Sequence, residues 1–385
     1  MNYYELIYLK RQLKNKLIGR SIEQAVSPYK NYIEFFIHDD EEKFRLCFSS
    51  APGNIALYMD TYRGAKKSNT INFFEDIYHT EIIDVSIPET DRWLYIHFEN
   101  SQKLSFRLFS NRANVFLSGG NKILEVFKEY DKIGEPPPEP QFLELFTVEE
   151  DVSRKSTKNK LTALNPMIPR QNLKDLISIY DLENASLDRL KEFEKGICKE
   201  MIESPVFRLL ENGETTLLSE ETLPVKTQKE FESVNMLILD RYKNYSRSQR
   251  LKQRKSSLVK SLKRKIKRTK SGLSNLEKAD KGLERAEKYE KWGHLLMANA
   301  HLGHPSAKEI ELNDLYEEGK SVTIPLKENL DIAENAQRYY DKSSGAEKSY
   351  EQAMKRIPKM QAEKEKAEKL LKEAQSITNL WEFQD

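Results

Sequence analysis

Residues 241–270 decide the architecture of this chain, and they read RYKNYSRSQRLKQRKSSLVKSLKRKIKRTK. The stretch contains fourteen Lys and Arg residues and neither Asp nor Glu. An apolar stripe at helical spacing nevertheless continues through it, from Leu251 to Leu283. Its exposed cations lack the acidic neighbours one turn away that usually support lysines on a helix. The stretch therefore predicts a long basic helix that packs on a partner along one face.

A second helical arm follows further along the chain. At about 333–380, apolar side chains alternate at spacings of three and four, as in a coiled coil. The segment between the arms, 290–332, holds three glycines, two prolines and a strand-like run at 321–326. We therefore expect residues 231–385 to form a long antiparallel coiled-coil hairpin with a small α/β tip at 290–332. The alternative is that the apolar stripes form the ordinary core of a helical bundle.

The first third of the chain has a β-rich pattern. Residues 1–20 predict a short helix, and seven alternating, β-rich runs follow, separated by Gly, Pro, Asn and Ser. The runs span residues 32–38, 44–50, 54–60, 81–87, 93–98, 103–109 and 114–118. They indicate an antiparallel sandwich or barrel-like domain at 1–140, which the proline linker GEPPPEP at 134–140 closes. Prolines punctuate a helical pattern at 141–230, so the predicted fold class is α+β with a small helical middle region.

Composition and motif content exclude several classes of protein. The 385 residues are 38% apolar and 32% charged, and no apolar run is long enough to span a membrane. A signal-peptide core is missing, and Cys47 and Cys198 lie far apart, so we expect a reduced, cytoplasmic chain without disulfides. Common nucleotide-binding and hydrolase motifs are missing, and the six histidines lack the spacing of a zinc site. We therefore expect no metal, cofactor, small-molecule substrate or catalytic residue, and no enzymatic activity.

The net charge of +2 hides a strong asymmetry, because the 355 residues outside 241–270 carry a net charge of −12. Like charges concentrated on one helix repel each other, and an anionic partner relieves that repulsion. Nucleic acid, an acidic protein surface and a membrane face are the candidate partners, and a solvated coiled-coil face is the structural alternative. The density of uncompensated charge favours nucleic acid. The predicted phosphate-binding residues are Arg247, Arg250, Arg254, Lys255, Lys260, Lys263, Arg264, Lys265, Lys267, Arg268 and Lys270.

One dipeptide outside the basic tract also suggests a binding role. Asp91 and Arg92 lie in PETDRWLYIHF, at the entry to a predicted strand. Arginine offers a rigid bidentate fork for phosphate or a base edge, and the adjacent carboxylate can hold it or accept from a base amino group. From composition alone, a turn followed by a salt-bridged strand start is the simpler interpretation.

Several segments resemble the NFACT family of ribosome-associated quality-control factors, whose bacterial members are often labelled fibronectin-binding-protein-A-like. In the N-terminal region these are LKNKLIGRSIEQAV (13–26), TDRWLYIHF (90–98) and NRANVFLSGGNKILEVFK (111–128). The most specific similarity lies at 289–349, where GHLLMAN, VTIPL and ENAQRYY occur in the family's order. The tip-motif residues singled out by this similarity are Asn299, Asn335, Gln337 and Arg338.

The resemblance implies a concrete function. Related proteins bind large ribosomal subunits obstructed by a peptidyl-tRNA, and they recruit tRNA so that the nascent chain receives a template-free C-terminal tail, chiefly of alanine in bacteria. The ribosome performs the peptidyl transfer, so the factor itself is not the catalyst. By this resemblance Asp91 and Arg92 contact tRNA, the basic helix contacts rRNA, and the tip docks on a stalk-base protein or on RNA. A membrane partner is not implied.

The resemblance also brings expectations about the remaining regions. The N-terminal domain should look like that of formamidopyrimidine-DNA glycosylase, but Asn2 follows Met1 where the glycosylase has its nucleophilic proline, so no base excision is expected. Residues 161–176 lack hairpin glycines and predict a degenerate helix-hairpin-helix element. The family continues into a C-terminal RNA-binding domain beyond the position of Asp385, so the chain is either truncated or a member without that domain. A nucleic-acid-binding architectural protein and a surface fibronectin-binding adhesin stay as alternatives.

Overall fold

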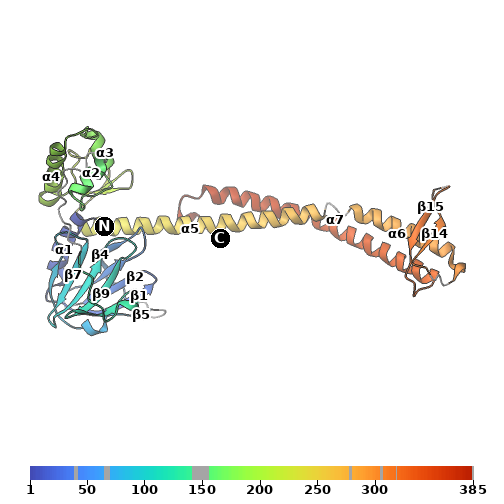
Figure 1. The fold of residues 1–385 in the computed structure, drawn as a ribbon, viewed down its shortest axis with the longest axis horizontal. Helices are drawn as coiled ribbons and strands as arrows, with labels where there is room; N and C mark the ends of the chain where they lie inside the picture. The colour runs from blue at the N-terminus through green and yellow to red at the C-terminus, as the bar shows by residue number, and fades with distance from the viewer. Residues whose placement is uncertain are drawn as a thin grey trace. The chain divides into compact units, whose positions relative to one another are not determined.

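The computed structural model describes residues 1–38, 42–64, 70–140, 156–276, 280–303, 307–317 and 319–383. The chain divides into two compact units, Met1–Arg247 and Ser248–Asp385 (Figure 1). The described residues combine helices and strands, which confirms the α+β prediction. The first unit contains both regions 1–140 and 141–230, and the boundary between these two regions stays a prediction.

Two five-stranded antiparallel sheets build the N-terminal part of the first unit, in the orders β4-β3-β2-β1-β5 and β10-β9-β8-β7-β6. Phe106 of the second sheet packs against Phe35 and Phe48 of the first, with ring centroids 5.5 and 5.7 Å apart. The two sheets therefore pack face to face, as the sandwich prediction requires, although the alternation did not predict β1, β5 and β10. The strands are β1 (Ile22–Tyr29), β2 (Tyr32–His38), β3 (Lys43–Ser49), β4 (Ala56–Thr61), β5 (Ile71–Asn72), β6 (Ile82–Ser86), β7 (Trp93–Phe98), β8 (Gln102–Arg107), β9 (Asn114–Gly119) and β10 (Lys122–Val126).

Helix α1 (Tyr3–Leu17) packs on this core. Its leucines at positions 6, 9, 13 and 17 are fully buried, which confirms the helix predicted from their spacing. The helix begins with a capping box, in which the Asn2 side chain accepts from the Glu5 backbone N–H and the Glu5 carboxylate accepts from the Asn2 N–H. This cap places the residues before α1 at a fixed position beside the sheets.

The middle of the chain is only partly helical. The helices α2 (Thr157–Leu164), α3 (Leu173–Ile179) and α4 (Leu187–Glu203) confirm the predicted cluster of short helices, but residues 207–231 form a three-stranded sheet of order β12-β11-β13. Buried Arg208 stabilises this sheet, because its guanidinium donates to Thr227 and to the carbonyls of Leu218, Leu223 and Val225. The strands are β11 (Phe207–Leu210), β12 (Thr215–Thr216) and β13 (Thr227–Phe231).

The predicted coiled-coil hairpin is present in the second unit. Helix α5 (Val234–Leu276), which begins in the first unit, and helix α6 (Asp280–Ala298) form one arm, and α7 (Ile332–Ser376) forms the other. Two hydrogen bonds fix their antiparallel register: the Lys255 ammonium donates to the Ile377 carbonyl at 2.9 Å, and the Ser343 hydroxyl donates to the Ala286 carbonyl at 2.8 Å. Small buried residues on α7, among them Ala367 and Ala374, pack on Leu262 and allow the two helices to approach closely.

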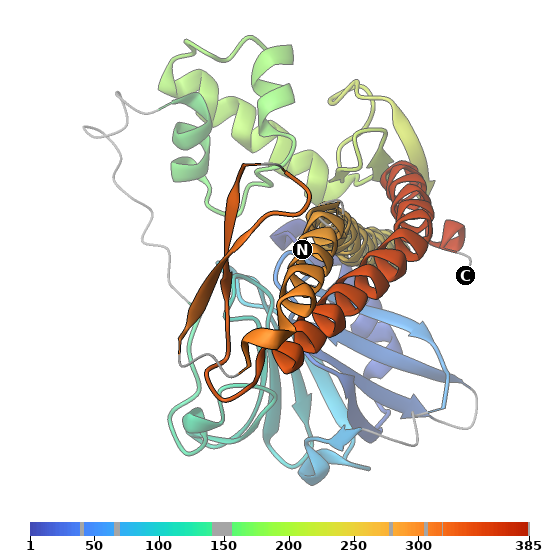
Figure 2. The same ribbon diagram turned by 90° about the vertical axis from the view of Figure 1, so that its right-hand side faces the viewer.

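A small antiparallel sheet of two strands, β14 (Glu309–Asn313) and β15 (Ser321–Pro325), connects the arms. Figure 2 shows this sheet alongside α6 and α7, and the buried side chains of Leu312 and Ile324 join it to them. The strand predicted at 321–326 is confirmed, but the tip begins later than residue 290, because α6 continues to Ala298. Short 3-10 helices occur at Glu75–Ile77, Tyr130–Lys132, Ala300–Leu302 and Leu380–Glu382.

A close contact between the arms gives a first testable prediction. A Cβ on Gly293 would lie 2.7–3.0 Å from three ring atoms of Tyr340, so Gly293→Ala forces α6 and α7 apart. We expect this variant to lower the free energy of unfolding of the tip by about 1–3 kcal/mol, as other overpacked interiors do. Gly345→Ala is the matched control, because nothing lies within 4 Å of its added Cβ and alanine favours the helix. Equal amide exchange rates around Tyr340 in the two variants would contradict the prediction.

Candidate nucleic-acid interface

Asp91 and Arg92 occupy the turn that leads into β7, and they play different parts there. Asp91 is 8% exposed, and its carboxylate accepts from the Arg92 backbone N–H at 2.6 Å and from the Trp93 indole N–H at 3.1 Å. Both bonds hold the backbone of the turn. Asp91 therefore positions Arg92, and its contacts with Arg92 and Trp93 do not direct it toward a ligand.

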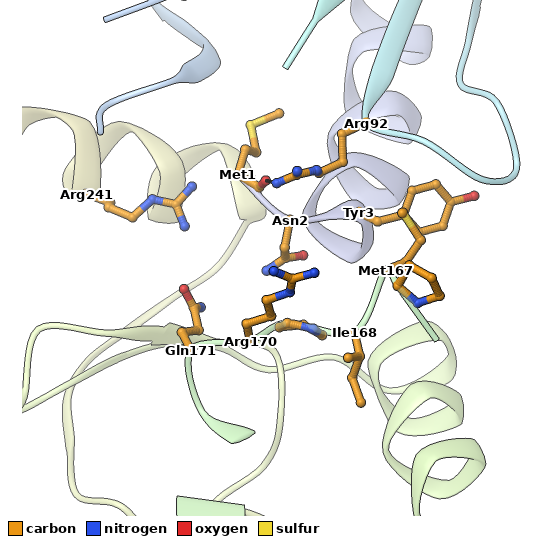
Figure 3. Close-up of a pocket in the computed structure, with 11 residues that line it drawn as sticks. Met1, Asn2, Tyr3, Arg92, Met167, Ile168, Arg170, Gln171 and Arg241 are labelled. Atoms are coloured by element: carbon orange, nitrogen blue, oxygen red, sulfur yellow. Dashed lines mark hydrogen bonds between the residues drawn. The ribbon is translucent and has the colours of Figure 1, made fainter. Parts of the chain in front are cut away.

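Arg92 lines a pocket of about 370 Å³ within the first unit (Figure 3). Its guanidinium lies 3.4 Å from the Met1 carbonyl oxygen and 5.6 Å from the centroid of the Phe109 ring. Residues before and at the start of α1, the loop between α2 and α3, and one residue of α5 form the remaining walls. These residues are Met1, Asn2, Tyr3, Pro166, Met167, Ile168, Pro169, Arg170, Gln171 and Arg241.

The pocket carries unbalanced positive charge. Arg241 forms a bidentate ion pair with fully buried Glu5, at 2.5 and 3.0 Å, so its charge is compensated. Arg92 and Arg170 form no ion pair with any carboxylate in the described part of the chain. Burial, together with the nearby charge of Arg170, lowers the pKa of Arg92 despite the opposing effect of Asp91. Two guanidinium groups therefore reach an open pocket, and an anion bound there would relieve their mutual repulsion.

The sequence did not single out Arg170 and Gln171, which belong to the segment predicted to be a degenerate helix-hairpin-helix element. Here α2 and α3 are joined by residues 165–172, and the Asn165 side chain shapes this loop by accepting from the Met167 N–H at 2.9 Å. Prolines at 166 and 169 replace the glycines of an ordinary hairpin. A proline-rich loop that carries an arginine between two helices is the signal that could have identified the second guanidinium.

The basic tract on α5 exposes most of its predicted residues. Every residue of the predicted phosphate-binding set is exposed except Lys255, which is half-buried and donates to the Ile377 carbonyl. Leu262 and Thr269 of the same tract are buried, and Leu262 packs on Ala367 and Ala374 of α7. Across residues 247–270, no Lys or Arg forms an ion pair with a described carboxylate. The tract therefore presents uncompensated cations along one side of the hairpin, as phosphate binding requires.

Two of the four tip-motif residues hold the backbone of the tip together. Asn335 is fully buried, and its amide donates to the carbonyls of Lys327, Leu330 and Asp331 while its oxygen accepts from the Lys327 N–H. Asn299 donates to the Leu295 carbonyl at the end of α6. Gln337 donates to Asp341 at 3.0 Å, and the Arg338 guanidinium lies 5.7 Å from the Tyr339 ring. Asn299 and Asn335 therefore fix backbone, and Gln337 and Arg338 lie nearer the surface.

Two further properties bear on ligands. Among the described residues, no group of three His, Cys, Asp or Glu side chains could hold a metal ion. His304, one of the six histidines considered for a zinc site, lies outside the described residues. The described helices include none that is long and apolar enough to cross a membrane.

Comparison with known proteins identifies the family. Residues 141–385 match the family described as NFACT N-terminal and middle domains, and this chain belongs to that family. A similar protein is the Rqc2 homolog RqcH of Streptococcus pneumoniae (strain D39), which is 23% identical over 369 residues covering 87% of this chain. Another is the Rqc2 homolog RqcH of Bacillus subtilis (strain 168), which is 23% identical over 96% of this chain and 71% of its own length. The chain spans 64% of the length of the pneumococcal relative.

Two solved structures also superpose on part of this chain. The N-terminal part of the fibronectin/fibrinogen-binding protein from Streptococcus suis superposes on 63% of this chain and 99% of its own, with a TM-score of 0.46 and 16% identity. The fibrinogen binding protein from Staphylococcus aureus covers 62% of this chain and 97% of its own, with a TM-score of 0.45 and 14% identity.

Proposed function

We propose that this chain is an RNA-binding, ribosome-associated quality-control factor. It binds large ribosomal subunits obstructed by peptidyl-tRNA, together with tRNA, and supports template-free tailing of the stalled nascent chain, chiefly with alanine. The uncompensated cationic surface on α5 is the observation that carries this proposal, and membership of the NFACT family supports it. Phosphate contacts of this kind give salt-sensitive affinity with little sequence readout, which suits a factor that binds along rRNA.

In this proposal the pocket around Arg92 contacts tRNA. A guanidinium fork binds phosphate oxygens through charge-assisted hydrogen bonds, and Asp91 keeps the fork in place through the backbone of the turn. The tip docks on the large subunit, with a stalk-base protein as the proposed partner. The chain supplies position and charge rather than catalysis, works in the cytoplasm, and needs neither a membrane nor a small-molecule substrate.

A variant of Arg92 tests the tRNA contact. We expect Arg92→Ala to weaken association with folded tRNA by about 10- to 100-fold, because hydrogen bonds to charged groups contribute about 1.5–3 kcal/mol each. Binding to large subunits should persist, because the basic tract is unchanged. Arg112→Ala is the matched control, since Arg112 is exposed and does not line the pocket. Filter binding at fixed salt measures the affinities for tRNA and for large subunits. Equal tRNA affinities for the two variants would show that Arg92 does not contact tRNA.

The same assay distinguishes this proposal from an architectural DNA-binding role. Folded tRNA and duplex DNA of equal length are compared at matched salt. The proposal requires tighter binding of tRNA, whereas an architectural role on duplex DNA requires the reverse order.

A further inference from the structure

Strand β15 at the tip has an outer edge that no other strand covers in the described part of the chain. The hydrogen bonds from Leu326 N–H to the Lys308 carbonyl (2.7 Å) and from Asp314 N–H to the Lys320 carbonyl (2.9 Å) continue the register of the β14–β15 ladder at its two ends. Hydrogen-bonded pairs alternate with non-bonded pairs in an antiparallel ladder, so the even-numbered residues pair with β14. The N–H and C=O groups of Ser321 and Thr323 therefore point away from β14.

The outer edge of β15 cannot pair with another strand at Pro325, but it can do so at Thr323. Pro325 has no N–H, and its carbonyl accepts from the Tyr339 hydroxyl of α7 at 2.6 Å. Two residues earlier, Thr323 lies on a groove of about 390 Å³ that β15 forms with α6. The α6 wall includes Trp292 and Leu295, and Figure 2 shows the strands running beside this helix. An open strand edge beside a groove that offers some apolar contact is the geometry that accepts an additional extended strand.

The charged side chains that line the groove indicate which kind of peptide it can bind. Its rim carries three carboxylates, on Glu284, Glu287 and Asp314. The two lysines of the groove are turned toward aromatic rings, because the Lys288 ammonium lies 4.5 Å from the Trp292 ring and the Lys291 ammonium 5.3 Å from the Tyr316 ring.

The sequence of the whole tip agrees with this acidic groove. Residues 290–332 contain eight Asp and Glu against four Lys and no Arg, in contrast to the basic tract of α5. An acidic surface repels the phosphates of nucleic acid and attracts lysine and arginine side chains.

We propose that the outer edge of β15 binds an extended, Lys- or Arg-bearing peptide segment of a protein partner, which adds to the β14–β15 sheet as a third strand. The main chain of Thr323 supplies the hydrogen bonds. The peptide side chains that point toward α6 enter the groove, where a lysine or arginine packs its apolar stem on Trp292 and brings its charge to the carboxylates of Glu284, Glu287 and Asp314. This proposal is independent of the proposed function in RNA binding.

Proline variants on the two edges test the proposal directly. The probe is a fluorescein-labelled peptide of alternating Lys and Val, KVKVKVKV, and its fluorescence anisotropy reports binding to the full chain. We expect Thr323→Pro to weaken binding at least tenfold, because proline removes the outward N–H of β15 while every ladder hydrogen bond remains. Asn313→Pro makes the same change at an outward position on β14, and it should leave the affinity within twofold of the unaltered chain.

A second measurement uses the unaltered chain and does not depend on how a variant folds. Saturating KVKVKVKV should slow amide hydrogen exchange at Thr323 at least tenfold and leave the outward amide of Asn313 unchanged. Three results would each overturn the proposal: equal binding by Thr323→Pro, no protection of the Thr323 amide, or tighter binding of an acidic EVEVEVEV peptide. Displacement of KVKVKVKV by a single-stranded RNA oligonucleotide that itself protects Thr323 would also overturn it, because the groove would then be an RNA site.

Discussion

Replacing Lys263, Arg264, Lys265, Lys267 and Arg268 with Gln is expected to weaken association with large ribosomal subunits by tenfold or more at physiological salt. The five side chains are exposed on α5, and none forms an ion pair within the described residues. Their charges are therefore available for phosphates, and each phosphate contact that is lost flattens the dependence of log affinity on log salt by about 0.7–0.9. Sedimentation with purified subunits at several salt concentrations measures both effects.

The other arm of the hairpin provides a matched control for this variant. Lys355, Arg356, Lys359, Lys366 and Lys369 are also exposed, but their helix intersperses acidic residues that the basic tract lacks. Gln substitution of these five should cause a smaller loss of affinity and a smaller change in salt dependence. Glutamine has nearly the helix propensity of lysine, so circular dichroism should show both variants fully folded. Unchanged sedimentation of the α5 variant would exclude phosphate contacts by this tract.

Substituting Glu5 by Gln is expected to lower the free energy of unfolding of the first unit by about 3 kcal/mol at pH 7, as breaking a buried ion pair does. The Glu5 carboxylate is fully buried, and it joins α1 to α5 through both nitrogens of the Arg241 fork. Glutamine fits the same space but leaves the guanidinium without its counter-charge. Chemical denaturation of the two proteins measures the difference.

The pH dependence of the free energy of unfolding provides a second test of the Glu5–Arg241 ion pair. Burial alone would raise the pKa of Glu5, but the charge and hydrogen bonds of Arg241, with the Asn2 N–H, hold that pKa below its ordinary value. A lowered pKa in the folded state means that the stabilisation is fully present above the ordinary pKa and is lost as the pH falls below it. The difference between Glu5→Gln and the unaltered chain should therefore shrink in acid.

A surface pair serves as the control for Glu5. The Lys14–Asp84 ion pair is 2.7 Å long, but both side chains are more than 40% exposed. Asp84→Asn should change the free energy of unfolding by less than about 1 kcal/mol, as is usual for solvated pairs. Equal effects of Glu5→Gln and Asp84→Asn would show that Glu5 does not join α1 to α5 as described.

Much of the architecture could be predicted from periodicity. The leucines of α1, the strands β2 and β7 and the two helical arms follow local patterns of burial that the sequence displays directly. Strand β1 is less regular, because Gln24 and Pro28 interrupt its alternation and its pairing with β2 contains register shifts. The sequence pattern did not predict the sheet at 207–231, because a charged residue such as Arg208 indicates an exposed position. In the fold Arg208 is buried, and its guanidinium donates hydrogen bonds to carbonyls distant in the sequence.

The candidate site was predictable only in part, for the same physical reason. Asp91 and Arg92 are adjacent, so their turn could be identified from the local sequence. The pocket also needs Arg170, which folding brings to Arg92 from another segment of the chain. The compensation of Arg241 by Glu5 likewise depends on residues more than 230 positions apart. Long-range pairing of charges decides which cations are available to a ligand, and a single sequence does not display it.

Recovery of RNA from cells tests the central claim most directly. The tagged chain is purified gently from its own host at low salt, and the bound RNA is sequenced beside that of the variant with five Gln substitutions on α5. The account predicts enrichment of large-subunit rRNA together with one or a few tRNAs, and loss of the rRNA from the variant. RNA at background level with the unaltered chain would contradict the account and leave the basic tract as a solvated face of the coiled coil.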